Sequence, residues 1–286
     1  MMTEKKSVLV TGATGRQGGA VAAELLTNGF HVKAMTRNPE NEKAKSLKGR
    51  GAEIVKADFD DPSSLEKAFS GVWGMFAMQD TWTAGVEKEE VQGKRVAEIA
   101  KKAGVQHFVY TSVGSAHRNT GIPHFENKWR IEQTLSSLSF PSHVILRPVF
   151  FMENLLTPWF KPYIDQGTLA VGINPTTRLQ MITVADIGKY GLRAFQNPEK
   201  LSGRAIDIAG DALTMPEAAA IISKVKGTPV AHFRVPIEEV RKASEDYALM
   251  LEWFDKVGYD VDINAISKES GFTPTRFGNW AKSAAW

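Results

Sequence analysis

A short apolar run leads directly into three regularly spaced glycines, and this feature constrains the fold more than any other. Residues 7–10 read Ser-Val-Leu-Val, and Gly12, Gly15 and Gly18 follow before an amphipathic stretch begins. At a strand-to-helix junction the first glycine allows a sharp turn, the second lets phosphates approach the backbone, and the third lets the helix pack closely. The N–H groups at such a helix start favour an anion. We therefore predict a nucleotide-binding turn, the alternative being an ordinary glycine turn.

Strand-like and helix-like stretches alternate through the first half of the chain. The strand-like stretches are 7–10, 31–35, 53–55, 72–78, 107–112 and 143–146, and the helix-like stretches include 18–28, 40–47, 87–103 and 127–138. This alternation is typical of βαβ units, in which helices cover both faces of a parallel sheet. Right-handed crossovers favour the doubly wound arrangement. We predict an α/β fold with a doubly wound parallel sheet, the NAD(P)-binding Rossmann fold.

The alternation becomes irregular after Pro148, where tryptophan, proline and glycine interrupt it. We predict a dinucleotide-binding domain over residues 1–155, with residues 180–212 completing its sheet. Residues 156–179 and 213–286 are predicted to form a smaller α+β lobe that covers the ligand-binding edge and contacts a substrate or partner.

Composition excludes several classes of protein. The chain has 35 Lys and Arg against 32 Asp and Glu, and this net charge of +3 is too small to indicate direct nucleic-acid binding. It has no cysteine, and its six histidines lack metal-ligand spacing, so we expect no metal site. No apolar run is long enough to span a bilayer, and the N-terminus lacks a secretory signal, so we expect a cytoplasmic protein. The charge-rich stretch 87–95 is interpreted as a solvated helix face.

The residues after the second predicted strand indicate which dinucleotide would bind. An NAD site has Asp or Glu at this point to bind the ribose 2′-hydroxyl. Here the strand ends Met35-Thr36-Arg37-Asn38, and the guanidinium of Arg37 matches a 2′-phosphate in charge and geometry. Arg16 and Lys43 could lie on the same side. We predict NADP(H) rather than NAD(H), the alternative for Arg37 being a solvated loop charge.

Several segments resemble the NmrA-like family of atypical short-chain dehydrogenase/reductases, in particular its NADPH-sensor branch. They are residues 10–18, 36–39, 57–61, 124–128, 147–156 and 184–188. The first segment is shared with the wider superfamily, whereas 124–128 and 147–156 are more specific to this branch. The resemblance implies a Rossmann domain and a small C-terminal lobe, with NADP(H) bound between them.

The resemblance also implies a cofactor site at the ends of the predicted strands. The residues implied to contact the cofactor are Gly12, Thr14, Gly15, Arg16, Gln17, Gly18, Arg37, Asp58, Phe59, Met78, Gln79, Lys128, Pro148 and Phe151. The glycine turn would hold the pyrophosphate, and Arg37 the 2′-phosphate. Asp58 and Phe59 would flank the adenine, and Lys128 would reach the nicotinamide ribose. The segment 148–151 would pack against the nicotinamide.

The catalytic pair departs from the superfamily pattern, in which a tyrosine precedes a lysine by four residues on one helix face. Here His124 occupies the tyrosine position before Lys128. Histidine can act as a general acid near neutral pH, so His124 is a candidate proton donor. The alternative is that His124 positions the helix and Lys128 only binds the ribose. Ser112, at a strand end, is either a catalytic hydroxyl or a turn residue.

Two functions fit these residues. The first is an NADPH-dependent oxidoreductase that reduces a small quinone-like or conjugated carbonyl acceptor, which needs less proton assistance than a ketone. The second is a non-catalytic, NADP(H)-responsive redox sensor that acts through protein partners. We favour the reductase, because the aromatic residues after Pro148, with Trp82 and Trp129, could enclose a small molecule. The sequence does not name the acceptor or partner, and it leaves the oligomeric state open.

Overall fold

The computed structural model describes residues 6–286, which form two compact units. Of the described residues, unit 1 contains 6–116, 124–147 and 187–206. Unit 2 contains residues 117–123, 148–186 and 207–286. The sequence placed the corresponding boundary at residue 155 and the returning segment at 180–212. Across residues 6–286, no helix combines the length and the hydropathy that a membrane-spanning segment needs.

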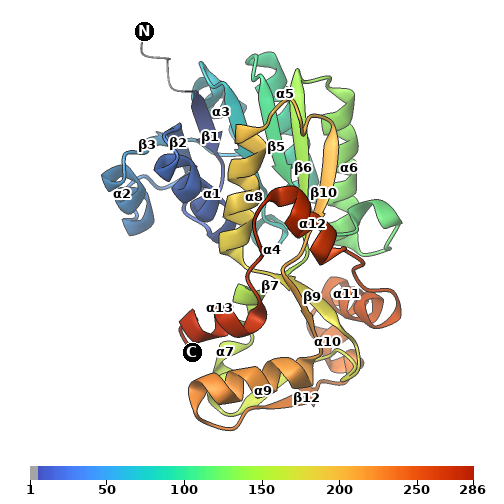
Figure 1. Ribbon diagram of the computed structural model, residues 1–286. Coiled ribbons are helices and arrows are strands. Elements are labelled where there is room, and N and C mark those ends of the chain that lie inside the picture. The colour runs from blue at the N-terminus through green and yellow to red at the C-terminus, as the bar shows by residue number, and fades with distance from the viewer. Residues whose placement is uncertain (1–5) are drawn as a thin grey trace. The chain divides into compact units, whose positions relative to one another are not determined.

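A seven-stranded sheet is the central element of unit 1 (Figure 1). Its strands are β1 (Ser7–Val10), β2 (His31–Thr36), β3 (Glu53–Lys56), β4 (Gly74–Ala77), β5 (His107–Thr111), β6 (Ser142–Pro148) and β10 (Arg204–Ile208). They lie in the order β10-β6-β5-β4-β1-β2-β3, and the pairs from β3 through to β6 are parallel. The order of the first six strands is that of the doubly wound dinucleotide-binding fold, so the predicted fold class is confirmed.

Helices cover both faces of this sheet (Figure 1). They are α1 (Arg16–Thr27), α2 (Glu42–Gly49), α3 (Pro62–Phe69), α4 (Thr81–Ala84), α5 (Val86–Lys102), α6 (Pro123–Ser137) and α8 (Val184–Gln196). Side-chain caps fix the start of α2, α3 and α4, where Asn41, Asp61 and Asp80 accept from backbone N–H groups. Strand residues such as Leu9 and Phe108 share one buried cluster with Leu65 of α3, Val96 of α5 and Ile131 of α6.

Helix α6 begins earlier than the sequence predicted. We expected a helix from Asn127, but it starts at Pro123, a residue that fits the first turn because no N–H is needed there. The buried face of α6 includes His124, Asn127 and Glu132 among apolar residues. These polar positions hide the helical period from an analysis based on hydrophobicity. The longer helix carries both His124 and Lys128.

Glycines set how closely α1 approaches its neighbours. A Cβ at Gly18 would lie 2.5 Å from the carbonyl carbon of Gly12 and 2.5 Å from the carbonyl oxygen of Thr11. Gly12 has φ +58°, and a Cβ there would overlap the side chain of Met78. Between α1 and α8, a Cβ at Gly191 of α8 would lie 2.8 Å from Cγ2 of the buried Val21. At each of these three glycines the backbone therefore lies in contact with neighbouring backbone or side-chain atoms.

Unit 2 contains two small sheets and several short helices. Its strands are β7 (Phe150–Phe151), β8 (Thr168–Val171), β9 (Leu179–Ile182), β11 (Asp211–Leu213) and β12 (Ala231–Arg234), in the orders β11-β9-β7 and β12-β8. Its helical segments are η1 (Ala116–Arg118), η2 (Met152–Leu156), α7 (Lys161–Asp165), α9 (Met215–Lys226), α10 (Ile237–Ala243), α11 (Glu245–Lys256), α12 (Ile263–Ser270) and α13 (Phe277–Ser283). A reciprocal capping box between Thr214 and Glu217 starts α9.

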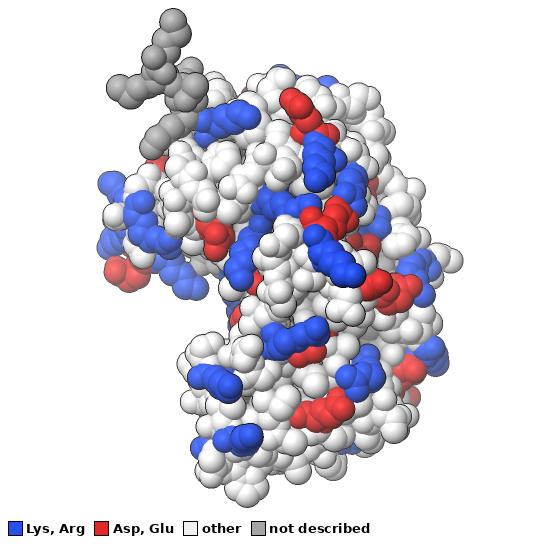
Figure 2. Space-filling view, viewed as in Figure 1, with Lys and Arg blue, Asp and Glu red and all other residues white. Residues whose placement is uncertain are grey.

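The charged side chains are mixed in sign on the face that Figure 2 shows. Many pair locally, as Lys45 does with Glu42 and Lys242 with Glu239. Exposed pairs of this kind contribute at most about 1 kcal/mol each to stability.

We expect Gly18→Ala to lower the free energy of unfolding by about 1–3 kcal/mol, because the new Cβ meets backbone that moves only if α1 moves. The matched control is Gly49→Ala at the end of α2, where a Cβ would have no neighbour within 4 Å. This control should be neutral or slightly stabilising, because alanine favours a helix over glycine. Urea unfolding measures both variants. Equal midpoints for the two would show that close packing at Gly18 does not fix α1.

Candidate functional site

A threonine hydroxyl ties together the carboxyl ends of β1 and β4. Oγ1 of Thr11 donates to the carbonyl of Met78 at 3.0 Å and accepts from the N–H of Met78 at 2.8 Å. Thr11 is fully buried. The two bonds satisfy both backbone groups of Met78 just after β4 ends, beside the glycine turn. The structure thus brings Met78 and Gly12 together, as the sequence predicted them to share one edge of the sheet.

The start of α1 is open to an anion. Gly15 precedes the helix and is exposed, and the N–H of Gly15 donates to the carbonyl of Gly12 at 2.8 Å. Among residues 6–286, no side chain caps this helix at Gly15, so its first-turn N–H groups remain for a ligand. Arg16 is exposed at the same place. Gln17 is different, because its Oε1 accepts from Oγ1 of Thr111 at the end of β5, at 2.8 Å.

The predicted adenine-side residues follow β2 and β3. Arg37 directly follows β2 and is exposed. The carboxylate of Asp58, after β3, accepts from the N–H of Asp60 at 2.9 Å. Phe59 is half-buried against the hydrophobic core, and its carbonyl accepts from Nη1 of Arg95 at 2.7 Å. These residues stand at the same edge of the sheet as the glycine turn, because parallel strands end together there.

Two buried side chains at this edge carry polar atoms that have no hydrogen-bond partner within residues 6–286. Gln79, just after β4, is 3% exposed, and both its amide nitrogen and its amide oxygen are unpaired. Ser112, just after β5, is 5% exposed, and its hydroxyl is unpaired. Leaving such a group unpaired costs about 1–3 kcal/mol, so native proteins rarely do it. The unpaired atoms lie where doubly wound sheets bind their ligands.

His124 lies in the first turn of α6 and is almost fully buried. Its ring centre is 5.3 Å from that of Trp82 in α4 and 4.8 Å from that of Phe125. Trp82 itself is 64% exposed. An aromatic surface therefore lies beside the imidazole, within unit 1.

Within residues 6–286, Tyr110 is the only tyrosine on a strand of the unit 1 sheet. Tyr110 is in the middle of β5 and is 1% exposed. Burial, followed by the negative charges of Glu89 and Glu132, raises the pKa of Tyr110 well above its ordinary value. A phenol held in this way keeps its proton and has no route to a ligand.

Lys128 is held by a buried carboxylate that the sequence analysis misassigned. Its Nζ lies 2.5 Å from Oε1 of Glu89, which has no exposed surface. The prediction that residues 87–95 form a solvated helix face is wrong for Glu89 and Gln92, which are both buried. The signal was present in the spacing, because Glu89, Gln92, Gly93 and Val96 fall on one face of α5.

Pro148 and Phe151 occupy other elements. Pro148 is the last residue of β6 and Phe151 is half-buried in β7, a strand of unit 2. Their packing against a nicotinamide stays a prediction.

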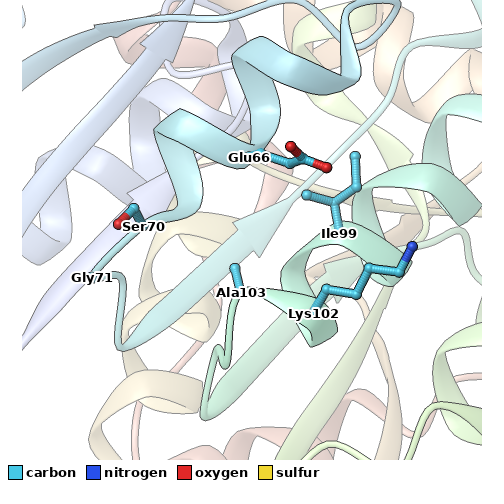
Figure 3. A pocket seen from close by; sticks show the side chains of 6 residues that line it. All are labelled: Glu66, Ser70, Gly71, Ile99, Lys102 and Ala103. Atoms are coloured by element: carbon cyan, nitrogen blue, oxygen red, sulfur yellow. The ribbon is translucent and has the colours of Figure 1, made fainter.

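A pocket of about 310 Å³ lies elsewhere in unit 1, between α3 and α5 (Figure 3). It is lined by Glu66, Ser70, Gly71, Ile99, Lys102 and Ala103. These residues precede β4 and β5, so the pocket lies at the amino edge of the sheet, opposite the candidate site.

Comparison with known protein families identifies the chain. The model of the NmrA-like family matches residues 4–281. The chain belongs to the NmrA-like family. An NmrA-like domain-containing protein of Dictyostelium discoideum is 32% identical over 270 residues, 88% of each chain. The NmrA-like domain-containing oxidoreductase FrzB of a Cladobotryum species is 32% identical over 246 residues, 77% of this chain and 73% of that protein.

Solved structures share the fold over almost the whole chain. The NADPH-dependent quinone oxidoreductase QOR2 of Escherichia coli, complexed with NADPH, matches with a TM-score of 0.82 and 23% identity, covering 96% of this chain and 99% of that one. NmrA, a negative transcriptional regulator in complex with NADP, matches with a TM-score of 0.79 and 18% identity, covering 99% and 96%.

Proposed function

We propose that this NmrA-like protein binds NADP(H) at the carboxyl edge of the unit 1 sheet and transfers hydride to a small quinone-like or conjugated carbonyl acceptor. The observation that carries the proposal is the set of buried, unpaired polar atoms on Gln79 and Ser112, next to an uncapped helix start. Related proteins named as oxidoreductases, and the NADPH complex of the quinone oxidoreductase with this fold, support it.

The residues at this edge fit a dinucleotide with a 2′-phosphate. The start of α1 offers N–H donors to the pyrophosphate, and the exposed Arg16 adds positive charge. Arg37, in place of the acidic residue of NAD sites, offers a forked donor to the 2′-phosphate. Gln79 and Ser112 offer one amide and one hydroxyl further along the same edge. Asp58, which follows β3 at the same edge, would flank the adenine.

The reaction chemistry is divided between the cofactor and two residues of α6. NADPH, when bound, supplies the hydride. Lys128 would donate hydrogen bonds to the nicotinamide ribose, and His124 would donate the proton that the reduced acceptor needs. The aromatic surface of Trp82 beside His124 suits a planar acceptor.

A redox sensor is the second candidate function. It is favoured by His124 at the position where a tyrosine is the usual proton donor, with Tyr110 buried in β5, and by NmrA, a regulator that shares this fold. Trp159 and Tyr163 of unit 2 are 80% and 53% exposed. Such aromatic side chains are enriched at protein interfaces, so a partner protein would have apolar surface to contact.

We expect Arg37→Glu to weaken NADPH binding by about 1.5–3 kcal/mol or more, roughly ten- to hundredfold in Kd, because a charge-assisted contact is lost and a repulsive one is added. NADH binding should change little. The matched control is Arg50→Glu at the exposed far end of α2, which should leave both affinities unchanged. Isothermal titration measures all six dissociation constants. A wild type that binds NADH as tightly as NADPH would overturn the assignment of the 2′-phosphate to Arg37.

We expect His124→Ala to lower the turnover of NADPH with a panel of quinones, aldehydes and ketones by roughly 10²–10⁴-fold, because a positioned proton donor is removed. Its NADPH affinity should stay near that of the wild type, whereas Lys128→Ala should weaken cofactor binding. The decrease in NADPH absorbance reports turnover.

The matched control for this experiment is His31→Ala at the start of β2, where the imidazole pairs with Glu53 at the surface. This variant should keep full turnover. Unchanged turnover in His124→Ala would make His124 a structural residue. A wild type without turnover on any acceptor, but with protease sensitivity that depends on NADP(H), would favour the sensor.

A further inference from the structure

Glu89 of α5 carries a completely buried carboxylate that accepts hydrogen bonds from side chains of two neighbouring helices. Its Oε1 accepts from Nζ of Lys128 at 2.5 Å, and its Oε2 accepts from Nδ2 of Asn127 at 2.9 Å. The hydroxyl of Thr81 in α4 also donates to Oε2. Asn127 is anchored a second time, because its Nδ2 donates to the carbonyl of Val86 at 2.8 Å. One carboxylate thus links α4, α5 and α6.

This arrangement is a poor way to stabilise a fold. Burying a carboxylate and an ammonium costs several kcal/mol per ion, and apolar residues of similar size often serve stability as well or better. Burial opposes the ionisation of Glu89, but the Lys128 ammonium and the Thr81 and Asn127 donors outweigh it and keep the pKa of Glu89 below its ordinary value. The carboxylate is therefore charged at neutral pH, and it compensates the charge of Lys128.

The geometry leaves Lys128 able to bind something else. An ammonium has three N–H donors. Glu89 accepts one of them, and Lys128 has no second hydrogen-bond acceptor within residues 6–286. The side chain of Lys128 is 13% exposed, whereas that of Glu89 is not exposed at all. The carboxylate therefore holds the ammonium from its buried side, and two donors remain.

A second buried ion pair on α6 offers a comparison. Glu132, also on α6, accepts from Nε of Arg147 at 3.0 Å and from Nη2 at 2.6 Å. The guanidinium of Arg147 also lies over the ring of Trp129, 5.7 Å from its centroid. Both partners of that pair are buried, at 8% and 1% side-chain exposure. In contrast, the Glu89 pair has one partner that reaches the surface.

We propose that Glu89 is the positioning residue for Lys128: it fixes the ammonium so that the remaining N–H donors meet the nicotinamide ribose. Glu89 does not touch the cofactor and acts only through Lys128. The inference rests on the proposed function, since it assumes that NADP(H) occupies the edge of the unit 1 sheet.

The experiment compares two ligands that differ in the part Lys128 would contact. NADPH has the nicotinamide ribose, and 2′,5′-ADP lacks it but keeps the 2′-phosphate end. We expect Glu89→Gln to raise the Kd for NADPH at least tenfold and to leave the Kd for 2′,5′-ADP within twofold of the wild type. In a Lys128→Met background the same substitution should change the NADPH Kd less than twofold.

Two further variants make the result specific. Glu90→Gln alters the next carboxylate of α5, which pairs with Lys94 and Arg130 rather than with Lys128, and should leave the NADPH Kd within twofold. Glu89→Asp keeps the buried charge but withdraws it by one methylene. We expect it to raise the Kd for NADPH at least threefold and to leave the Kd for 2′,5′-ADP unchanged. It therefore provides the test if Glu89→Gln does not fold.

The outcomes separate this inference from the proposed function. Equal weakening of both ligands by either Glu89 variant would mean that Glu89 only supports the fold, and no weakening of NADPH would exclude a positioning role. A wild type that binds neither NADPH nor 2′,5′-ADP would instead overturn the proposed function.

Discussion

The backbone of α1 touches the backbone of the turn before it, and the rest of unit 1 is arranged around that contact. Gly18 leaves no room for a Cβ against Gly12 and Thr11. Because the helix lies this close, its first N–H groups stand directly after the end of β1. Gly12 can then lie against Met78, whose backbone is held by the Thr11 hydroxyl. One steric constraint thus sets the distance between two strand ends and an open helix start, which together form the candidate phosphate site.

The charged side chains of the candidate site differ in how far they are buried. In the proposed binding mode, the cationic side chains at the phosphate end are Arg16 and Arg37, which are exposed and lose little hydration. At the other end the charge is buried: Lys128 reaches the surface only in part and depends on Glu89 beneath it. An exposed cation suits a charged phosphate, which attracts it over several ångströms. A neutral ribose hydroxyl offers only directed hydrogen bonds, so the donor that meets it has to be held in place.

Most of the sheet could be predicted from the sequence, because its signals are local. The apolar strands and the glycine spacing each act within a few positions, and they indicate the βαβ series without knowledge of the partners. The short strands of unit 2 were not predicted. Strands such as β8 and β12 have only four residues each and pair with each other across a long separation, so no local pattern marks them.

Only those parts of the candidate site that depend on the backbone could be predicted from the sequence. The turn and the strand ends fall where the sequence placed them, since parallel strands fix that edge. The burial of Glu89 was missed because the mixed charges of 87–95 were weighed and the helical spacing of the buried positions in α5 was not. Its burial depends on Lys128, 39 positions away in the chain. Long-range pairing of this kind leaves no trace in hydrophobicity or spacing beyond the buried face of α5.

The central claim is that a dinucleotide binds along the carboxyl ends of β1, β2 and β4 in unit 1. Hydrogen–deuterium exchange of the whole chain, with and without saturating NADPH, tests it directly. The account predicts slower exchange of backbone amides in segments 12–18, 36–38 and 78–81, with no change in segment 99–106 at the opposite edge of the sheet. Unchanged exchange in those three segments, or protection confined to the opposite edge, would contradict it.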